Sequence, residues 1–134
     1  MTDQRPSLSV IIVNFNSTPL LAECLRSLES STVADQLQVI VVDNASTDFD
    51  VEALRGEHPA VMFLPRDRNT TYTGGNNIGF GEATADLVLM LNPDTRLEPD
   101  ALERALAHMA EEPDLAALTA YLIGPDEALQ RYYR

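Results

Sequence analysis

Blocks of apolar residues alternate with amphipathic and polar segments along this 134-residue chain. Four apolar runs rich in aliphatic and β-branched residues predict strands, at residues 8–13, 37–41, 61–64 and 86–91. Segments with helical spacing or capping signals predict helices between and after them, at residues 18–28, 51–55, 76–85 and 99–112. In the first of these helices, Cys24 is expected to be a core residue, because apolar residues recur at helical spacing at Leu20, Leu21, Cys24, Leu25 and Leu28. The C-terminal residues add an expected strand at 115–121, a turn at 124–127 and a last strand at 128–134.

This order of elements predicts an α/β fold, in which a mostly parallel sheet is flanked by helices. We expect residues 1–134 to form one domain, because the chain is long enough for a single core and contains no linker or repeat. The turn after the first strand reads Asn14-Phe15-Asn16-Ser17-Thr18-Pro19. It lacks the glycines of a dinucleotide-binding turn and the lysine of a P-loop, so both of those nucleotide folds are disfavoured.

Polar residues follow three of the predicted strands directly. The first strand runs into Asn14 and Asn16, the second into Asp43 and Asn44, and the strand at 86–91 into residues 92–94. In open α/β sheets, ligands bind at the carboxyl ends of the strands. The three polar ends therefore predict one binding site at that edge of the sheet.

Asn92 and Asp94 are two residues apart, so an extended backbone places both side chains on the same side. A carboxylate in this position can share Mg²⁺ or Mn²⁺ with substrate phosphates. The alternative is that residues 92–95 form only a turn, since Asn-Pro is a common turn dipeptide. Asp43 and Asn44 have a similar alternative, an Asx-type turn that leads into a capped helix.

Composition narrows the range of partners. The net charge is −12, and all nine basic residues are arginines. A basic patch that would neutralise nucleic-acid phosphates is missing, so we expect no nucleic-acid partner. A phosphate-ester ligand would need a divalent cation or well-placed arginines. The single cysteine and the lack of a signal-peptide pattern at the N-terminus predict a cytoplasmic protein.

Four motifs, taken in order, closely resemble the family 2 glycosyltransferases, and most nearly their rhamnosyltransferase-type members. The resemblance runs from about Leu8 to Arg131, and its motifs are Val10–Asn16, Val41–Asp48, Asn69–Asn77 and Leu91–Thr95. It implies a GT-A fold that binds a nucleotide-diphosphate sugar with a divalent cation, Mg²⁺ or Mn²⁺. The implied activity is inverting transfer to a hydroxyl acceptor, a saccharide or lipid-linked saccharide, in the synthesis of cell-surface polysaccharide.

The resemblance also implies roles for single residues. Asn14 and Asn16 would lie beside the nucleotide, Asp43 would hold the base, and Asn92 would face the ribose and phosphates. Asp94, in the last place of the family's D-x-D motif, would ligate the metal. A loop that closes over the donor would contribute Asn69, Gly75 and Asn76.

Two positions depart from the family pattern. Thr71 stands where the family favours glycine, and it would be strained if that position requires a positive φ. Asn92 replaces the first aspartate of a strict D-x-D motif. Furthermore, no Glu-Asp pair follows Asp94, although the family's acceptor half supplies its general base from such a pair.

We therefore expect a donor-binding half, with the catalytic base beyond Arg134 and weak or no activity alone. A full-length protein would lie in the cytoplasm, at the inner face of the membrane. Two alternatives stay open: a non-catalytic nucleotide-sugar-binding module that self-associates through surface exposed by truncation, and, less favoured, a nucleotidyltransferase.

Other polar residues are expected to be structural. His58 and His108 are predicted to be surface residues, and Asp48 and Asp50 to cap the helix at 51–55. Arg66 and Arg68 flank the expected donor loop, and two interpretations stay open for them, offsetting diphosphate charge or solvation alone. Tyr132 and Tyr133 are expected to pack in the last strand.

Overall fold

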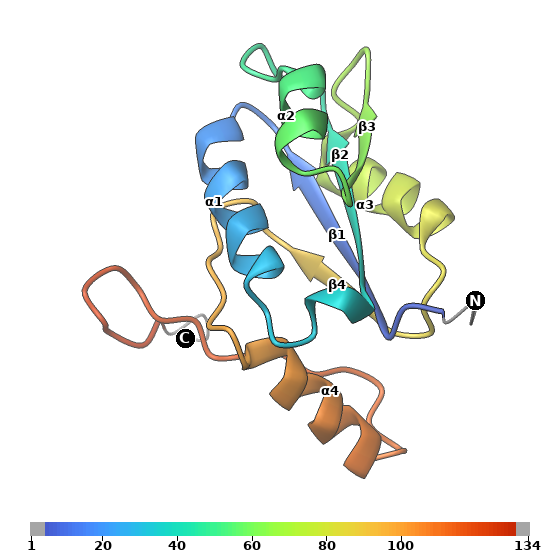
Figure 1. The fold of residues 1–134 in the computed structure, drawn as a ribbon, viewed down its shortest axis with the longest axis vertical. Coiled ribbons are helices and arrows are strands. Elements are labelled where there is room, and N and C mark those ends of the chain that lie inside the picture. The colour runs from blue at the N-terminus through green and yellow to red at the C-terminus, as the bar shows by residue number, and fades with distance from the viewer. Residues whose placement is uncertain (1–4, 131–134) are drawn as a thin grey trace.

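The computed structural model describes residues 5–130 as a four-stranded parallel sheet with helices on both faces (Figure 1). The strand order is β3-β2-β1-β4. The strands are β1 (Leu8–Asn14), β2 (Leu37–Asp43), β3 (Met62–Pro65) and β4 (Val88–Leu91). The helices are α1 (Thr18–Glu29), a 3-10 turn at Ala34–Gln36, α2 (Val51–Glu57), α3 (Thr71–Glu82) and α4 (Ala101–Glu111). The prediction of a mostly parallel α/β sheet is confirmed.

The two central strands are apolar over almost their whole length because helices cover both of their faces. All seven residues of β1 are buried, and so are the last four of β2. Helices α1 and α2 lie on one face of the sheet, and α3 lies on the other (Figure 1). Leu21, Cys24 and Leu25 of α1 join the main core, as the helical spacing predicts. Leu20 was expected to share this face, but its side chain is 47% exposed.

Helix α3 approaches the sheet closely through two glycines four residues apart. A Cβ on Gly75 would lie 2.7 Å from Cγ1 of Val13, and a Cβ on Gly79 would lie 2.4 Å from Cγ2 of Ile11. Residues four apart share one face of a helix, so both glycines turn toward β1. The backbone of α3 therefore rests directly on the side chains of that strand.

The prediction that this helix begins near Asn76 was wrong, because α3 begins five residues earlier, at Thr71. Threonine and glycine are poor helix formers, so the composition of residues 71–75 favours a loop. Asn44 accepts hydrogen bonds from Thr70 and donates one to the carbonyl of Thr71, and these bonds hold the segment in place together with the packing of Gly75 against Val13. Tertiary contacts thus override the local preference.

The predicted strand at 115–121 is also wrong, since those residues have no regular secondary structure. A strand needs a neighbour for its backbone hydrogen bonds, and β4 has one paired neighbour among the described residues, β1. The turn at 124–127 is present, flanked by a single antiparallel bridge between Ile123 and Leu129. The rest of the predicted last strand, with Tyr132 and Tyr133, lies outside the described residues.

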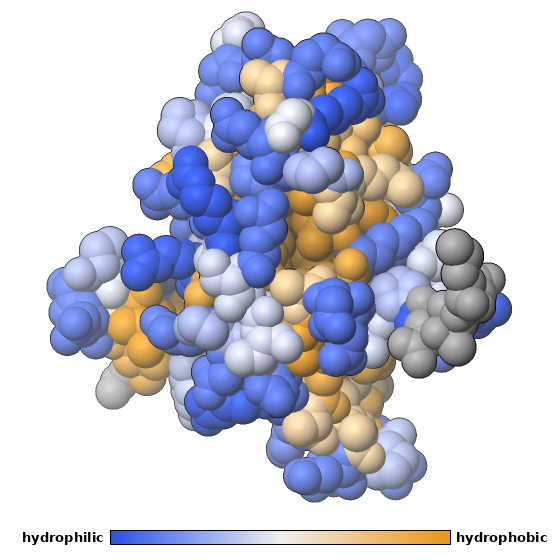
Figure 2. Space-filling view, viewed as in Figure 1, coloured by the Kyte–Doolittle hydropathy of each residue, from blue (hydrophilic) through white to orange (hydrophobic). Residues whose placement is uncertain are grey.

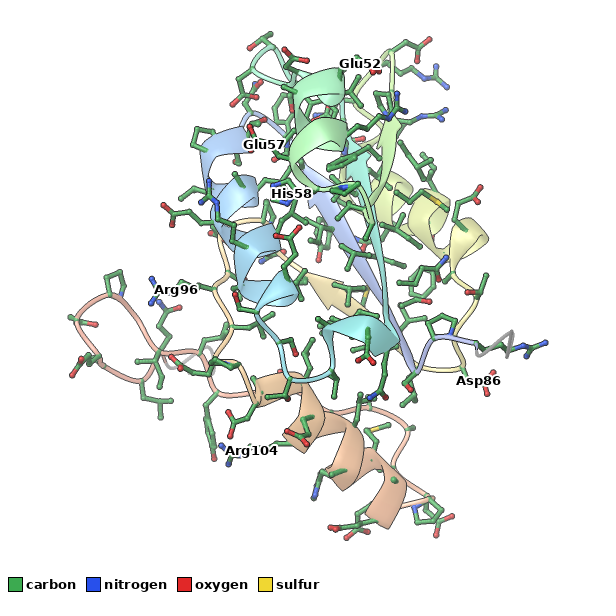
Figure 3. All side chains as sticks on the ribbon, viewed as in Figure 1. Glu52, Glu57, His58, Asp86, Arg96 and Arg104 are labelled. Atoms are coloured by element: carbon green, nitrogen blue, oxygen red, sulfur yellow. The ribbon has the colours of Figure 1, made fainter. Side chains whose placement is uncertain are left out.

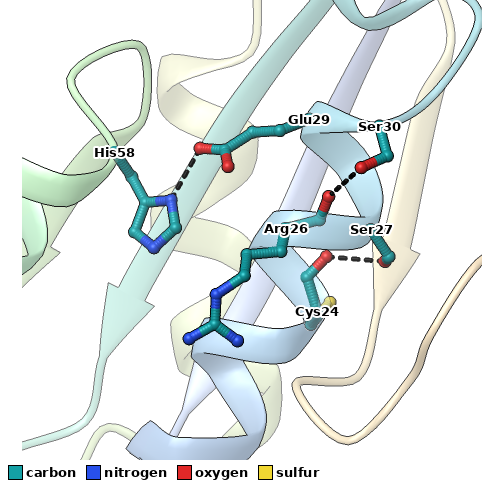
Figure 4. A network of polar contacts seen from close by, with 6 residues as sticks. All are labelled: Cys24, Arg26, Ser27, Glu29, Ser30 and His58. Atoms are coloured by element: carbon teal, nitrogen blue, oxygen red, sulfur yellow. Dashed lines mark hydrogen bonds and ion pairs between the residues drawn. The ribbon is translucent and has the colours of Figure 1, made fainter.

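His58 was expected at the surface, but the structure buries it between α1 and α2, with 2% of the residue exposed. Its ring Nδ1 lies 2.6 Å from Oε1 of Glu29 at the end of α1 (Figure 4). The ring Nε2 is buried and has no hydrogen-bond partner among the described residues. This contact joins residues 29 positions apart, so local sequence pattern could not reveal it. His108, by contrast, is exposed, as predicted.

The two capping aspartates serve different helices. Asp50 caps α2, because its Oδ1 accepts a hydrogen bond of 3.1 Å from the backbone N–H of Ala53. Asp48 accepts instead from the backbone N–H and the hydroxyl of Thr18, at 3.2 and 2.9 Å. The prediction for Asp48 was wrong: it satisfies a free N–H at the start of α1, where a carboxylate also interacts well with the helix dipole.

Apolar surface remains exposed in several places. Figure 2 shows it near the middle of one face, on α4 and on the C-terminal loop. The exposed apolar side chains include Met90 on the edge strand and a group in the C-terminal loop, Leu118, Tyr121, Leu122, Ile123 and Leu129. None of the helices within residues 5–130 has the length and apolar character that crossing a membrane requires.

Candidate functional site

The carboxyl ends of β1 and β2 meet in a buried hydrogen-bond network. Asn14 and Asp43 are register partners, and Nδ2 of Asn14 donates to Oδ1 of Asp43 at 2.9 Å. The Ser46 hydroxyl donates to the same oxygen at 2.6 Å, and the Ser46 backbone N–H donates to Oδ2 at 2.9 Å. Asp43 is only 2% exposed. The Asx-type turn considered from the sequence is therefore present, and the role of Asp43 in holding a base stays a prediction.

Asn16 extends this network to the loop after β2. Its Oδ1 accepts from the backbone N–H of Thr47 at 2.9 Å, and its own N–H donates to the Ser46 hydroxyl at 2.8 Å. The side chain of Asn14 lies beneath, fully buried, and its Oδ1 has no hydrogen-bond partner in the described chain. These hydrogen bonds join the loops that follow β1 and β2 into one continuous rim at the carboxyl edge of the sheet.

The segment expected to close over the donor begins α3 and lies against the end of β2. Asn69 accepts a hydrogen bond of 2.8 Å from the backbone N–H of Thr71, and Nδ2 of Asn76 donates to the carbonyl of Tyr72 at 3.0 Å. Asn76 and Gly75 are buried, whereas Asn69 is exposed. Gly75 and Asn76 therefore lie on the buried side of the segment, and Asn69 lies on its exposed side.

A residue with a positive φ angle lies shortly after the end of each of the strands β1, β2 and β3. They are 49° at Asn16, 62° at Ala45 and 69° at Thr71. Asparagine visits this region readily, but a β-branched residue there is a true outlier. The expected strain at Thr71 is confirmed, since this threonine adopts the conformation that glycine would adopt freely.

The end of β4 supplies the third polar segment. The register pairs Ile12 with Leu91, so β4 ends two residues before the end of β1. Asn92 and Asp94 are both exposed, and the backbone N–H of Thr95 donates to the Asn92 carbonyl at 3.2 Å. The turn that the sequence allowed is present, and it leaves the Asp94 carboxylate open to solvent.

Cys24 of α1 lies beneath this turn. Its Sγ is 3.9 Å from the carbonyl oxygen of Asn92, which accepts a weak hydrogen bond from the thiol. Burial, and to a lesser extent the negative charge of Asp94, raise the pKa of the Cys24 thiol from 9.0 to about 12. The thiol is therefore protonated and unreactive at neutral pH, and it serves as a core residue, as predicted.

A metal at this edge of the sheet would have to be shared with a ligand. Within residues 5–130, no three His, Cys, Asp or Glu side chains gather closely enough to hold a metal by themselves. Mg²⁺ and Mn²⁺ are hard cations, and Mg²⁺ is typically held by one or two carboxylates together with substrate phosphates and water. Asp94 offers one such carboxylate, exposed at the sheet edge where the resemblance places the diphosphate.

The structure thus brings the candidate residues to one edge, in two groups. Asn14 and Asp43 share a direct hydrogen bond, and Asn16 is joined to Asp43 through the Ser46 hydroxyl. Asn44, which follows β2, joins the segment with Asn69, Gly75 and Asn76 to this group. Asn92 and Asp94 are near in register but make no side-chain hydrogen bond to either group in the described structure. Asn44 and Ser46, which hold these groups together, were not chosen from the sequence as site residues. The sequence signal that could have identified them is their position in the motif Val41–Asp48, which spans the end of β2.

This arrangement is the GT-A fold of glycosyltransferases, as comparison with solved structures shows. The mannosyltransferase PcManGT from Pyrobaculum calidifontis, solved with GDP-Man and Mn²⁺, superposes with a TM-score of 0.71 and 28% identity, over 81% of this chain and 33% of that one. S. aureus TarS 1-349, solved with UDP-GlcNAc, superposes with a TM-score of 0.72 and 23% identity, over 80% and 32%.

The sequence profile of glycosyl transferase family 2 matches residues 9–134, and the chain belongs to that family. An N-acetylglucosaminyltransferase of Bradyrhizobium elkanii is 31% identical over 88% of this chain and 67% of its own length. A second N-acetylglucosaminyltransferase, from Mesorhizobium japonicum, is 34% identical over 84% of this chain and 28% of its own length. These names differ from the expected rhamnosyltransferase subgroup, which stays a prediction. In three of the matching N-acetylglucosaminyltransferases, the segment shared with this chain makes up only 25–31% of the relative's own length.

Proposed function

We propose that this chain binds a nucleotide-diphosphate sugar at the carboxyl edge of its sheet, as the donor site of a glycosyltransferase. One observation carries the proposal: Asp94 is exposed in the turn that follows β4, at the same carboxyl edge of the sheet where the paired strands β1 and β2 end in Asn14 and Asp43. Such a carboxylate suits a divalent cation that the donor diphosphate also ligates. The nucleotide would then lie over the rim formed by Asn14, Asn16 and Asp43.

The charge balance supports a cation in this role. The chain carries a net charge of −12, which repels a diphosphate unless positive charge is supplied locally. Arg66 and Arg68 follow β3 at the same edge, both are exposed, and neither forms an ion pair within the described structure. Together with the metal, they would offset the charge of the diphosphate.

In the complete reaction, the bond between the sugar's anomeric carbon and the diphosphate breaks, and the acceptor oxygen bonds to that carbon from the opposite side. Asp94 would hold a divalent cation there, which would supply positive charge for the departing diphosphate. An aspartate or glutamate removes the proton of the acceptor hydroxyl, and we assign this role to no residue within 5–130. The chain alone is therefore expected to bind the donor and to hydrolyse it weakly at most.

The names of the relatives narrow the choice of donor. Several are called N-acetylglucosaminyltransferases, and the Pyrobaculum mannosyltransferase was solved with GDP-Man. The sugar here would thus be a hexose or an N-acetylhexosamine, joined to uridine or guanosine diphosphate. The experiment below includes dTDP as well, since the sequence leaves uridine, thymidine and guanosine open as the nucleoside of the donor.

Calorimetric titration with UDP, GDP and dTDP, each with and without Mn²⁺, tests the proposal on three proteins. Wild type should bind one diphosphate in a metal-dependent manner, and Asp94→Ala should lose at least about tenfold in affinity, equivalent to about 1.4 kcal/mol. Asp86→Ala is the matched control, because Asp86 is exposed at the opposite end of β4 (Figure 3). Equal binding by all three proteins would refute the metal role, and no binding by wild type would refute the donor site.

A non-catalytic module that self-associates is the second candidate. The exposed apolar side chains of Met90, Tyr121 and Ile123 favour it, because solvent-exposed apolar patches promote association. Light scattering across a range of protein concentrations distinguishes the candidates. A stable dimer without metal-dependent nucleotide binding would favour the module.

A further inference from the structure

Asn44 connects the end of β2 to the start of α3 more directly than any other side chain in residues 5–130. It follows the last residue of β2 and is 2% exposed. Its Nδ2 donates to the carbonyl of Thr71 at 2.9 Å, and its Oδ1 accepts from the backbone N–H and the hydroxyl of Thr70, at 3.2 and 2.7 Å. Its own backbone N–H donates to the carbonyl of Asn14 at 2.9 Å. The side-chain amide and the backbone N–H of this one residue thus join the ends of β1 and β2 to the start of α3.

The residue that Asn44 holds is strained. Thr71 has a φ of 69°, which a β-branched side chain strongly disfavours. Such a conformation persists only where surrounding contacts impose it. Thr71 makes three hydrogen bonds: Asn44 donates to its carbonyl at 2.9 Å, its N–H donates to Oδ1 of Asn69 at 2.8 Å, and its hydroxyl accepts from the backbone N–H of Gly74 at 3.3 Å.

Packing around Gly75 places the next turn of α3 against the same amide. A Cβ on Gly75 would lie 2.7 Å from Cγ1 of Val13 and 3.4 Å from Nδ2 of Asn44. The first turns of α3 therefore rest on β1 and on the Asn44 side chain together. Asn69 and Asn76, which flank these contacts, are placed by the same arrangement.

We propose that Asn44 is a positioning residue that holds residues 69–76 against the end of β2, with Thr71 kept in its left-handed conformation by those hydrogen bonds. The inference rests on the proposed function in one respect, that this segment borders the donor. Without the Asn44 amide, Thr71 relaxes to a negative φ and the segment leaves its place. Asn69 and Asn76 are then no longer set for a nucleotide-diphosphate ligand.

The test compares wild type, Asn44→Ala, Thr71→Gly and the double variant. In wild type, NMR should show a strong cross-peak between the amide and α protons of Thr71, as a left-handed residue gives, and Asn44→Ala should lose it. Asn44→Ala should also bind the diphosphate chosen by wild type about tenfold more weakly, since buried hydrogen bonds at the segment are removed. Thr71→Gly should bind about as well as wild type, because glycine adopts this φ without strain.

Unfolding in urea supplies a readout that needs no ligand. Thr71→Gly should raise the folding equilibrium constant of wild type by about fivefold or more, because it removes the strain. In the Asn44→Ala background, the same change should give no gain. Should Asn44→Ala fail to fold, Asn44→Asp replaces it, because aspartate keeps the acceptor for Thr70 and loses the donor to Thr71; the same NMR and urea results are expected.

The outcomes separate the two proposals. Additive effects of the two substitutions, or a left-handed Thr71 in both Asn44 variants, would overturn the positioning role even if the nucleotide binds wild type normally. A wild type that binds no diphosphate would refute the donor site, and the NMR and urea measurements would still decide the role of Asn44. Full affinity in Asn44→Ala would also count against it.

Discussion

Replacing Gly79 by alanine measures how closely α3 rests on β1. The added Cβ would lie 2.4 Å from Cγ2 of Ile11, which is fully buried, and 3.2 Å from its Cγ1. Carbon atoms pack best at roughly 3.5–4.0 Å, so the helix or the strand must shift. Overpacking of this kind destabilises a protein by about 1–3 kcal/mol. Alanine in place of glycine within a helix returns up to about 1 kcal/mol.

We therefore expect Gly79→Ala to lower the free energy of unfolding by about 1–2 kcal/mol. Gly81→Ala is the matched control on the same helix, because a Cβ there would meet nothing within 4 Å. It should stabilise the protein by up to about 1 kcal/mol. Urea unfolding followed by circular dichroism measures both, since a single domain of this size is expected to unfold in one cooperative step.

A second substitution identifies the contact itself. Ile11→Ala alone should destabilise by about 2–5 kcal/mol, because it leaves a cavity under α3. With Gly79→Ala added, the new methyl group enters that cavity, so the combined effect should be smaller than the sum. Equal stability of Gly79→Ala and Gly81→Ala would refute the close approach of α3 to β1, and so would strict additivity with Ile11→Ala.

Three further predictions concern single side chains. The pKa of the Cys24 thiol is 9.0 in the unfolded chain and about 12 in the folded protein. Between these two pH values only the unfolded chain loses the proton, so the free energy of unfolding should fall by about 1.4 kcal/mol per pH unit. Cys24→Ala should reduce this slope. Glu29→Ala removes the hydrogen-bond partner of buried His58 and should destabilise by about 1–3 kcal/mol, while exposed Glu23→Ala should change little; equal losses would contradict the contact. Asp50→Ala should destabilise by about 1 kcal/mol through loss of the α2 cap, and Asp50→Asn much less, by the same urea assay.

The arrangement of the elements could be predicted because it depends on short-range pattern. An almost wholly apolar run such as 8–13 is compatible with a strand covered on both faces, and the spacing of Leu21, Cys24 and Leu25 matches one face of a helix. The polar residues that end each strand then had to meet at one edge, since parallel strands share the same direction. The location of the candidate site follows from those facts.

The internal geometry of the site depends on contacts between residues far apart in sequence. Asn14 bonds to Asp43 and Ser46 across 29 and 32 positions, and Asn44 bonds to Thr71 across 27. No local pattern shows whether an aspartate after a strand faces a ligand or its neighbours. Here the hydrogen bonds turn Asp43 inward, while Asp94 stays exposed.

The sequence was therefore sufficient to predict the α/β class, the positions of most elements, the family motifs and the edge at which they gather. The comparison of motifs also indicated strain at Thr71, because threonine stands where related chains favour glycine. The start of α3, the burial of His58 and the hydrogen bonds of Asn44 became visible only in the folded structure. Each of these depends on a partner brought close by folding, and local preference is weak compared with the loss of a buried hydrogen bond or a close-packed contact.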